Sequence, residues 1–488
     1  MSNVNGQPEQ RGAETDYDLI VIGGGSGGYA AARTARDLGA KVAIVDRGPL
    51  GGLCILRGCM PSKTLIATSD LMHEIREAAT LGVRAGEPKL DFRAMIERKR
   101  EVIRGFADYR IEGLETFEIL RGPARFVGER ELAVGERVVR APNFIIATGS
   151  VVAPPAFPGL REAGYLHSDA ALDLEEPPKS LIVLGGGYVA IELGQFFARA
   201  GVPTTFVIRS PRLLTAADND IGEGLTGYLR GEGIRIVAEA RVERVERAGE
   251  LKRVVYRKDG REAWVEAHEI FYALGRVPNI EGLELERAGI RAHPVTGIEV
   301  DGAMRTTNRC IFAIGDVVGK YPLVHVAIQE GEVAARNAMT NGHIQIDYAL
   351  SKAHTIFSDP QVAVAGETEK ELQAAGVPYL KATYPFDDHG KAISIGKTKG
   401  FVKMLAAPED GKILGVQILG AEASDLIHEA IVAMYFRSTV FDFVRVPHLH
   451  PTMAEILTNP AEELVVRIEG ARMAATRGDL PVTAMVPG

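Results

Sequence analysis

The segment Tyr17–Asp46 reads YDLIVIGGGSGGYAAARTARDLGAKVAIVD, and it decides the class of fold. An apolar run, Leu19–Ile22, leads directly into Gly23 and Gly25, and an alanine-rich stretch then ends at Gly39 before a second apolar run. This order is typical of a strand, a tight turn, a helix and a second strand, which together form one βαβ unit. Glycines in the turn let a pyrophosphate approach the unpaired N–H groups of the helix N-terminus. The segment therefore predicts a dinucleotide site.

The same pattern recurs in Ser180–Arg209, which reads SLIVLGGGYVAIELGQFFARAGVPTTFVIR. Gly185, Gly187 and Ala190 repeat the glycine turn and the helix start. A lone glycine fingerprint is weak evidence, but two copies that each follow a strand and open a helix are specific. The chain is therefore expected to carry two dinucleotide sites.

The ends of the two second strands differ. Asp46 stands seven residues after Gly39, where an acid can accept hydrogen bonds from ribose hydroxyls. The equivalent position of the second unit is Ile208, followed by Arg209 and Arg212 and by no acid. Two guanidinium groups favour a 2′-phosphate, and hence NADPH over NADH. The alternative is that both arginines are solvated loop residues.

Length and charge narrow the classes of protein. A chain of 488 residues suggests about three domains. The formal net charge of −8 argues against a general nucleic-acid binder. No apolar run approaches the ~18 residues of a membrane span, and residues 1–16 carry no targeting pattern. A cytoplasmic protein with no membrane partner is expected.

Two of the three cysteines lie in Gly51–Lys63, GGLCILRGCMPSK. Their spacing is unusual for zinc and no second Cys/His pair is nearby, so no metal site is expected and a disulfide is favoured. Residues five apart on an ideal helix have Cα atoms about 8.7 Å apart, whereas a disulfide needs less than about 7 Å. Gly58 and Pro61 supply the required distortion of the helix. A distorted, short-loop disulfide is easily reduced.

Together these features resemble the class I flavoprotein disulfide reductases, which include dihydrolipoamide dehydrogenase, glutathione reductase and mercuric reductase. The resemblance spans about residues 17–470. It is carried by both glycine fingerprints, the cysteine segment, Ala147–Gly149, Gly315–Asp316 and the segment His448–Glu455, HLHPTMAE.

The resemblance implies FAD at the first fingerprint and NADPH at the second, with NAD as the open alternative. The implied cofactor-binding residues are Gly23, Gly25, Ser26, Gly27, Asp46, Gly52, Lys63, Thr148, Gly149, Gly185, Gly187, Tyr188, Val189, Arg209, Arg212, Gly275, Gly315 and Asp316. By the same resemblance, Tyr188 is expected to cover the flavin until the nicotinamide displaces it, and Asp316 is expected to hold the ribityl chain.

The resemblance also implies the catalytic groups. Cys54 is the thiol that meets substrate, and Cys59 lies against the flavin. Lys63 approaches the flavin and pairs with Glu192. The remaining two are His450, the acid–base partner of Cys54, and Glu455, which orients it.

Some residues keep a second interpretation. Thr452 and Glu455 match a capping box that opens a helix, so Glu455 is alternatively only a cap. Arg57 either lowers a thiol pKa or points to solvent. Cys310 is expected in a buried strand as an inert core residue. The histidines His325, His389, His428 and His448 are expected to be structural.

The expected fold is α/β, with two Rossmann-type domains and a C-terminal α+β dimerisation domain. The expected boundaries are a flexible tail at 1–16, an FAD-binding domain at 17–155 and 284–350, an NAD(P)-binding domain at 156–283, an interface domain at 351–472, and a flexible tail at 473–488. A homodimer with active sites shared between subunits is implied.

The expected function is FAD-dependent disulfide reduction of dihydrolipoamide-dehydrogenase-like type. Ile208 and Arg209, with Ser26 and Arg33, also match glutathione reductase. The cysteine-free C-terminus weakens the mercuric-reductase alternative. A non-thiol flavin oxidoreductase, such as a transhydrogenase or quinone reductase, and a structural subunit of a multienzyme complex are the alternatives from other classes.

Overall fold

The computed structural model describes residues 15–476, which form two compact units. The first unit contains residues 15–56, 104–151 and 276–346, and the second contains residues 57–103, 152–275 and 347–476.

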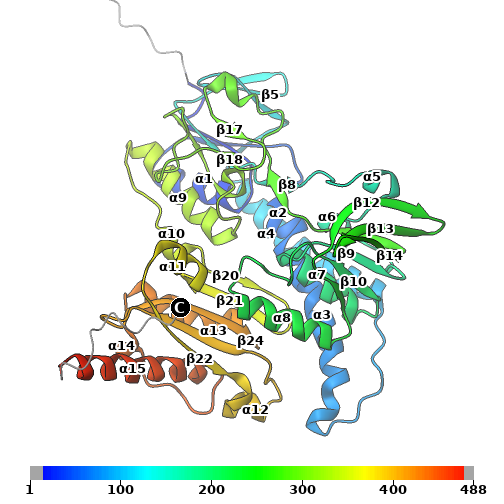
Figure 1. Ribbon diagram of the computed structural model, residues 1–488. Helices are drawn as coiled ribbons and strands as arrows, with labels where there is room; N and C mark the ends of the chain where they lie inside the picture. Colours follow the sequence, from blue (N-terminus) through cyan, green and yellow to red (C-terminus); the bar gives the residue numbers. More distant parts are fainter. Residues whose placement is uncertain (1–14, 477–488) are drawn as a thin grey trace, which may run out of the picture. The chain divides into compact units, whose positions relative to one another are not determined.

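A five-stranded parallel sheet forms the centre of the first unit (Figure 1). Its order is β19 (Ile311–Ala313), β7 (Asn143–Ile146), β1 (Leu19–Ile22), β2 (Val42–Asp46) and β3 (Glu118–Arg121). The three central strands β7, β1 and β2 are almost fully buried, as expected for a parallel sheet covered on both faces.

Helices α1 (Ser26–Asp37) and α9 (Val324–Thr340) lie side by side in this unit (Figure 1). Their approach depends on glycine. A Cβ on Gly27 would lie 2.8 Å from the carbonyl oxygen of Ala327, and one on Gly331 would lie 2.4 Å from that of Gly27. Both distances are too short for carbon, so only glycine permits this packing.

The second unit contains a four-stranded parallel sheet with a repeat of the same βαβ unit. Its order is β11 (Arg235–Val237), β10 (Thr204–Val207), β9 (Leu181–Leu184) and β15 (Glu269–Tyr272). Helix α7 (Tyr188–Arg199) connects β9 to β10, and α8 (Asn219–Gly231) precedes β11. An antiparallel meander, β12 (Arg241–Ala248), β13 (Leu251–Lys258) and β14 (Arg261–Ala267), follows.

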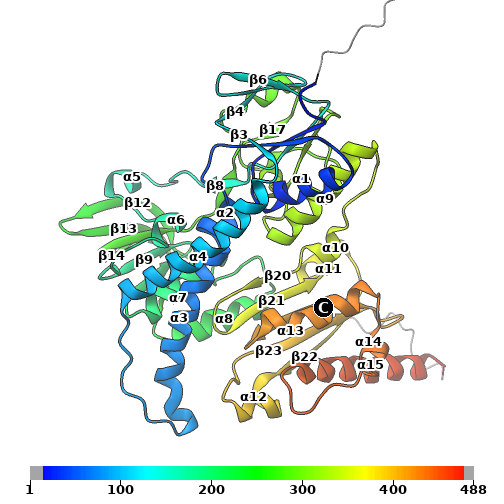
Figure 2. The ribbon, with the colours of Figure 1, turned by 180° about the vertical axis from the view of Figure 1, so that it is seen from behind.

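The second unit also contains a five-stranded antiparallel sheet. Its order is β20 (His354–Ile356), β21 (Gln361–Gly366), β24 (Ile413–Gly420), β23 (Phe401–Ala406) and β22 (Leu380–Pro385). Helices α13 (Ala423–Tyr435) and α15 (Thr458–Thr476) pack on this sheet (Figure 2). Strands with two helices in one apolar core make this an α+β domain.

The remaining described elements connect or flank the strands named above. The helices are α2 (Gly52–Arg57), α3 (Cys59–Glu77), α4 (Phe92–Leu114), α5 (Leu160–Ala163), α6 (Ser168–Ala171), α10 (Tyr348–Ser351), α11 (Glu369–Ala375), α12 (Gly390–Ser394) and α14 (Val440–Phe443). The 3₁₀ turns are η1 (Ala78–Leu81), η2 (Leu285–Ala288), η3 (Gly315–Val318), η4 (Phe386–Asp388) and η5 (Ala454–Leu457). The other strands are β4 (Ala124–Gly128), β5 (Glu131–Val134), β6 (Arg137–Arg140), β8 (Ser150–Val152), β16 (Arg276–Pro278), β17 (Ala292–His293) and β18 (Gly297–Ile298).

The predicted fold class is confirmed, with two Rossmann-type sheets and a C-terminal α+β domain. The domain boundaries stay predictions. Helix α15 continues to Thr476, and the rest of the expected C-terminal tail, like residues 1–14, lies outside the described residues.

One expectation is wrong: Cys310 precedes β19 and is half-buried, and its Sγ accepts a hydrogen bond from Arg130 Nη2 at 3.1 Å. None of the helices within residues 15–476 is long and apolar enough to cross a membrane.

Candidate active site

The first glycine turn closes so tightly that two of its glycines cannot be replaced. Gly23 has φ +109°, and a Cβ there would lie 2.3 Å from the carbonyl oxygen of Ala147. A Cβ on Gly28 would lie 1.9 Å from the carbonyl oxygen of Gly23. A Cβ on Gly25 would instead meet nothing closer than 4.0 Å. The turn is therefore packed on the sheet side and open at the start of α1, where an anionic group can approach the helix N-terminus.

Asp46 holds this turn in place. Its Oδ2 accepts a hydrogen bond from Gly24 N at 2.8 Å, and its Oδ1 accepts one from Gly48 N at 2.7 Å. Each carboxylate oxygen keeps capacity for a second bond. Asp46 can thus order the loop and still accept from a ribose hydroxyl.

A polar network surrounds Asp316 in the same unit. Ser150 Oγ donates to Asp316 Oδ2 at 2.6 Å, and Arg276 Nε donates to Ser150 Oγ at 3.0 Å. The buried carboxylate of Glu330, on α9, accepts from Gly315 N at 2.6 Å. Sequence reasoning missed Ser150, Arg276 and Glu330 as site residues. The only signal for the first two is that each directly follows the glycine that ends a buried strand.

The other expected residues of the first nucleotide site lie on the same turns. Ser26 is the first residue of α1, and a Cβ on Gly52 would lie 2.7 Å from Gly25 Cα. Thr148 Oγ1 donates to the carbonyl oxygen of Asn279 at 2.8 Å, and Gly149 has φ +71°.

The second glycine turn repeats the geometry of the first. Gly185 has φ +125°, and a Cβ there would lie 2.5 Å from the carbonyl oxygen of Ala273. A Cβ on Gly187 would meet nothing within 4 Å, and Ala190 is fully buried. Gly275 has φ +113°, and Val189 is 41% exposed on α7. The turn again leaves space at its helix N-terminus.

The two arginines of the second site differ in their surroundings. Arg209 is exposed and forms no hydrogen bond or ion pair with any described residue. Arg212 contacts Asn219 Oδ1 through Nη2 and lies 4.0 Å from Glu223, so α8 holds it. Arg209 is therefore the more available of the two for a phosphate.

The cysteine segment is broken as the spacing requires. Helix α2 ends at Arg57, Gly58 has φ −134° and ψ −114°, and α3 begins at Cys59. Cys54 and Cys59 therefore lie on separate helices, and both are half-buried. Arg57 is half-exposed, and its Nη1 lies 3.8 Å from the carboxylate of Asp169, so it does not point only to solvent. An effect of Arg57 on a thiol pKa stays a prediction.

Lys63 and Glu192 form the ion pair that the resemblance implies. Lys63 Nζ lies 2.7 Å from Glu192 Oε2, and Glu192 Oε1 accepts from Phe357 N at 3.0 Å. The ammonium group also lies 4.5 Å from the centre of the Phe357 ring. The buried carboxylate thus fixes the position of Lys63 on α3.

Tyr188 stacks on His354, with ring centres 5.4 Å apart and 3.0 Å between the hydroxyl oxygen and Nε2. His354 Nδ1 lies 3.1 Å from the carbonyl oxygen of Lys352, which can only accept. In the neutral ring Nδ1 therefore carries the proton, and Tyr188 donates to Nε2. Burial raises the pKa of Tyr188, which keeps the hydroxyl protonated.

His450 and Glu455 form a histidine–carboxylate pair. His450 Nδ1 lies 3.2 and 3.1 Å from the two carboxylate oxygens of Glu455, and the histidine side chain is 79% exposed. The capping box considered for Thr452 is wrong, because the turn here is η5, which starts at Ala454 and has no side-chain cap. Glu455 therefore contacts His450, and no side-chain cap hydrogen bond forms at η5.

A group of basic and aromatic side chains lies around Cys54 in the first unit. The Arg110 guanidinium stacks 4.7 Å from the centre of the Tyr29 ring, and that of Arg33 lies 5.6 Å away. Arg110 Nη1 is buried without a hydrogen-bond partner. Burial lowers the pKa of Arg110, while Tyr29 and Cys54 act in the opposite direction. These residues present positive charge without a carboxylate partner among the described residues.

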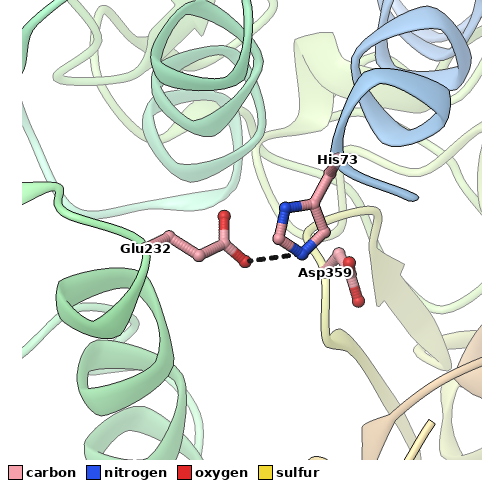
Figure 3. A group of neighbouring side chains, drawn as sticks. All are labelled: His73, Glu232 and Asp359. Atoms are coloured by element: carbon pink, nitrogen blue, oxygen red, sulfur yellow. Dashed lines mark ion pairs between the residues drawn. The ribbon is translucent and has the colours of Figure 1, made fainter. Parts of the chain in front are cut away.

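Two clusters have the residue types of a metal site but are already paired. His73, Glu232 and Asp359 face one another (Figure 3), yet Arg199 Nη2 lies 2.8 Å from Glu232 and 2.7 Å from Asp359. A second cluster, Asp218, Asp220 and Glu369, surrounds the fully buried Lys403 Nζ at 2.8–2.9 Å. In both, a cationic side chain of the protein already pairs with the carboxylates of the cluster.

Comparison with known proteins places these features in context. The family described as pyridine nucleotide-disulphide oxidoreductase matches residues 17–331, and its dimerisation domain matches residues 352–461. The chain is 36% identical to the dihydrolipoyl dehydrogenase of Geobacillus stearothermophilus, over 92% of this chain and 96% of the relative. It is 34% identical to the mercuric reductase of Bacillus cereus, over 96% of this chain and 73% of the relative.

Among solved structures, the chain resembles the HOCl-induced flavoprotein disulfide reductase RclA of Escherichia coli. The TM-score is 0.81 at 25% sequence identity, and the match covers 91% of this chain and 99% of the other.

Proposed function

Because this chain belongs to the pyridine nucleotide-disulphide oxidoreductase family, and is therefore an oxidoreductase of FAD- and NAD(P)H-dependent type, we propose that it reduces a small disulfide with NADPH. The observation that carries the proposal is the break at Gly58. Because of this break, Cys54 and Cys59 lie on two separate helices. The Cα distance of a continuous helix, which is too long for a disulfide, therefore does not apply to them.

The glycine turns support both cofactors. At Gly25 and Gly187 a Cβ would enter otherwise open space at a helix N-terminus, which is the cradle that a pyrophosphate needs. Asp46, Ser150 and Asp316 offer hydrogen-bonding groups in the first unit. A flavin held by these residues would supply hydride acceptance from the nicotinamide and two-electron transfer to the disulfide.

The overall reaction balances as NAD(P)H, one proton and one disulfide giving NAD(P)⁺ and two thiols. Once the Cys54–Cys59 disulfide is reduced, the Cys54 thiolate attacks a substrate sulfur, a new S–S bond forms and one substrate thiolate leaves. The Cys59 thiolate then attacks Cys54 Sγ, which restores the enzyme disulfide and releases the second substrate thiolate.

The His450–Glu455 pair fits the proton transfers of this exchange. Glu455 accepts from His450 Nδ1, so Nε2 of the neutral ring is available as a base for the Cys54 thiol. The protonated ring then delivers its proton to the leaving thiolate. The high exposure of His450 agrees with a role in the partner's active site, and the matched dimerisation domain indicates a homodimer.

Two classes of disulfide substrate are each supported by a different observation. Similarity to dihydrolipoyl dehydrogenase supports a lipoyl-type substrate. Arg33 and Arg110, which find no carboxylate among the described residues, support instead a disulfide that carries negative charge, as in the glutathione-reductase-like alternative.

Replacement of His450 by alanine tests the proposed chemistry. Reduction of flavin and enzyme disulfide by NADPH needs no imidazole at the outer sulfur, whereas attack on substrate does. We expect His450→Ala to slow the oxidative half-reaction by about 10²–10⁴-fold and to leave the reductive half-reaction unchanged in stopped-flow traces. His428→Ala, at an exposed histidine on α13, is the matched control. Equal slowing of both halves would contradict the proposal and favour a non-thiol oxidoreductase.

A further inference from the structure

His389 is a buried histidine next to the proposed dyad. It lies between η4 and α12, and it is only 3% exposed. Its Nδ1 accepts a hydrogen bond from Ala392 N at 3.4 Å, so the ring caps the N-terminus of α12. Capping alone would explain a histidine at this position, so the surroundings of the other ring nitrogen, Nε2, decide whether His389 does more.

The cap fixes the tautomer of His389. A backbone N–H can only donate, so Nδ1 must be unprotonated and the ring proton lies on Nε2. Burial lowers the pKa of His389, which keeps the ring neutral. Nε2 is buried and makes no well-formed hydrogen bond to a described residue. A buried donor without an acceptor is costly, so the group nearest to Nε2 matters.

That group is Glu455. His389 Nε2 lies 3.5 Å from Glu455 Oε1, while His450 Nδ1 lies 3.1–3.2 Å from both oxygens of the same carboxylate. Two imidazole N–H groups therefore converge on one carboxylate, one from the buried side and one from the exposed side. Hydrogen bonds at catalytic groups are often long before substrate binds and shorten in the complex.

We propose that His389 is a positioning residue that holds the Glu455 carboxylate against His450. The inference rests on the proposed function, since it requires His450 to serve thiol–disulfide exchange. With Glu455 anchored from behind, the His450 ring keeps its proton on Nδ1 and turns Nε2 toward the sulfur chemistry. His389 itself transfers no proton and touches no substrate.

Two substitutions separate positioning from capping. Asparagine at position 389 keeps an oxygen that caps α12 but removes the donor toward Glu455. Glutamine places an amide nitrogen near the position of Nε2 but weakens the cap. We expect His389→Asn to slow the oxidative half-reaction about tenfold, the order that one hydrogen bond supports. We expect His389→Gln to retain most of that rate while its melting temperature falls.

The measurements are stopped-flow rates of both half-reactions, alkylation of Cys54 by iodoacetamide in the reduced enzyme, and thermal melting, with His450→Ala beside them. In His389→Asn, Cys54 alkylation is expected to slow in the same direction as in His450→Ala. Normal rates in His389→Asn, or equal slowing by both His389 variants, would overturn the positioning role. If His450→Ala itself leaves the oxidative half-reaction unchanged, the proposed function fails instead.

Discussion

Arg209 and Arg212 stand three residues apart, but the fold gives them different surroundings. Arg212 is held by Asn219 and lies near Glu223, both on α8, whereas Arg209 is exposed without an acidic partner among the described residues. An unpaired guanidinium can form charge-assisted hydrogen bonds to a 2′-phosphate at no cost to an existing ion pair.

Arg209→Ala is therefore expected to raise the KM for NADPH by about 10- to 100-fold, because a hydrogen bond to a charged group contributes about 1.5–3 kcal/mol. The KM for NADH should change little, since NADH lacks the phosphate. Steady-state kinetics with both coenzymes measure this, and Arg230→Ala on α8 is the control. A wild-type enzyme that strongly prefers NADH would show that Arg209 is a bystander.

At the residue scale, the sequence predicts groups that belong to motifs and misses groups that act through contacts. Cys54, Cys59 and the glycines follow from local spacing. His389 and Ser150 do not, because each meets its partner across a long stretch of chain and no local pattern marks the contact. Glu330 lies only 15 residues from Gly315, but the two are joined by a turn that no motif predicts.

The second glycine turn makes a prediction at the scale of an element. A Cβ on Gly187 would meet no protein atom within 4 Å, and Gly187 has φ −89°, which alanine adopts without strain. Gly187→Ala should therefore fold, bind FAD and melt like the wild type. Its KM for NADPH should rise about tenfold or more, since overpacking a filled contact by a methyl group costs about 1–3 kcal/mol.

Gly227→Ala on α8, where a Cβ also meets nothing within 4 Å, is the matched control for this substitution. Unchanged coenzyme kinetics in Gly187→Ala would mean that the turn does not approach a pyrophosphate.

The carboxylate cluster around Lys403 joins α8, α11 and the antiparallel sheet within the second unit. Burial is the largest single effect and tends to raise the pKa values of Asp218 and Glu369, but the hydrogen bonds and charge of Lys403, together with hydrogen bonds from neighbouring groups, outweigh it and both pKa values are lowered. A carboxyl group with a lowered pKa stabilises the fold above its unfolded pKa and loses that contribution as the pH falls through the folded value.

Lys403→Met is expected to lower the free energy of unfolding by about 3–5 kcal/mol at pH 7, because it leaves buried carboxylates without their cation. The difference from wild type should shrink as the pH falls below about 4, because these carboxyl groups are then protonated in the unfolded chain and, at still lower pH, in the folded protein as well. Denaturant unfolding at pH 7 and below about pH 4 measures this difference in the free energy of unfolding. Lys381→Met, at a half-exposed lysine that also faces Glu369, should cost less than about 1 kcal/mol. Equal losses in both variants would contradict this account.

At the scale of the whole molecule, the sequence predicts the fold because the βαβ pattern occurs twice with complete context. The α+β domain follows from the change to alternating strands after Ser351. The close packing of α1 on α9 was not predictable, since it depends on Gly27 and Gly331, which lie about 300 residues apart in the sequence. The pairing of Arg57 with Asp169 was not predictable either, because Asp169 belongs to a short helix that no motif announces.

The most direct test of the central claim counts thiols. The chain has three cysteines, Cys54, Cys59 and Cys310. If Cys54 and Cys59 form a redox disulfide served by NADPH, the air-oxidised protein, denatured in a thiol reagent without oxygen, shows one reactive thiol per chain, that of Cys310. After one equivalent of NADPH per chain it shows three, while Cys54→Ser shows two in both states. Three thiols before reduction, or a count that NADPH leaves unchanged, would contradict the account.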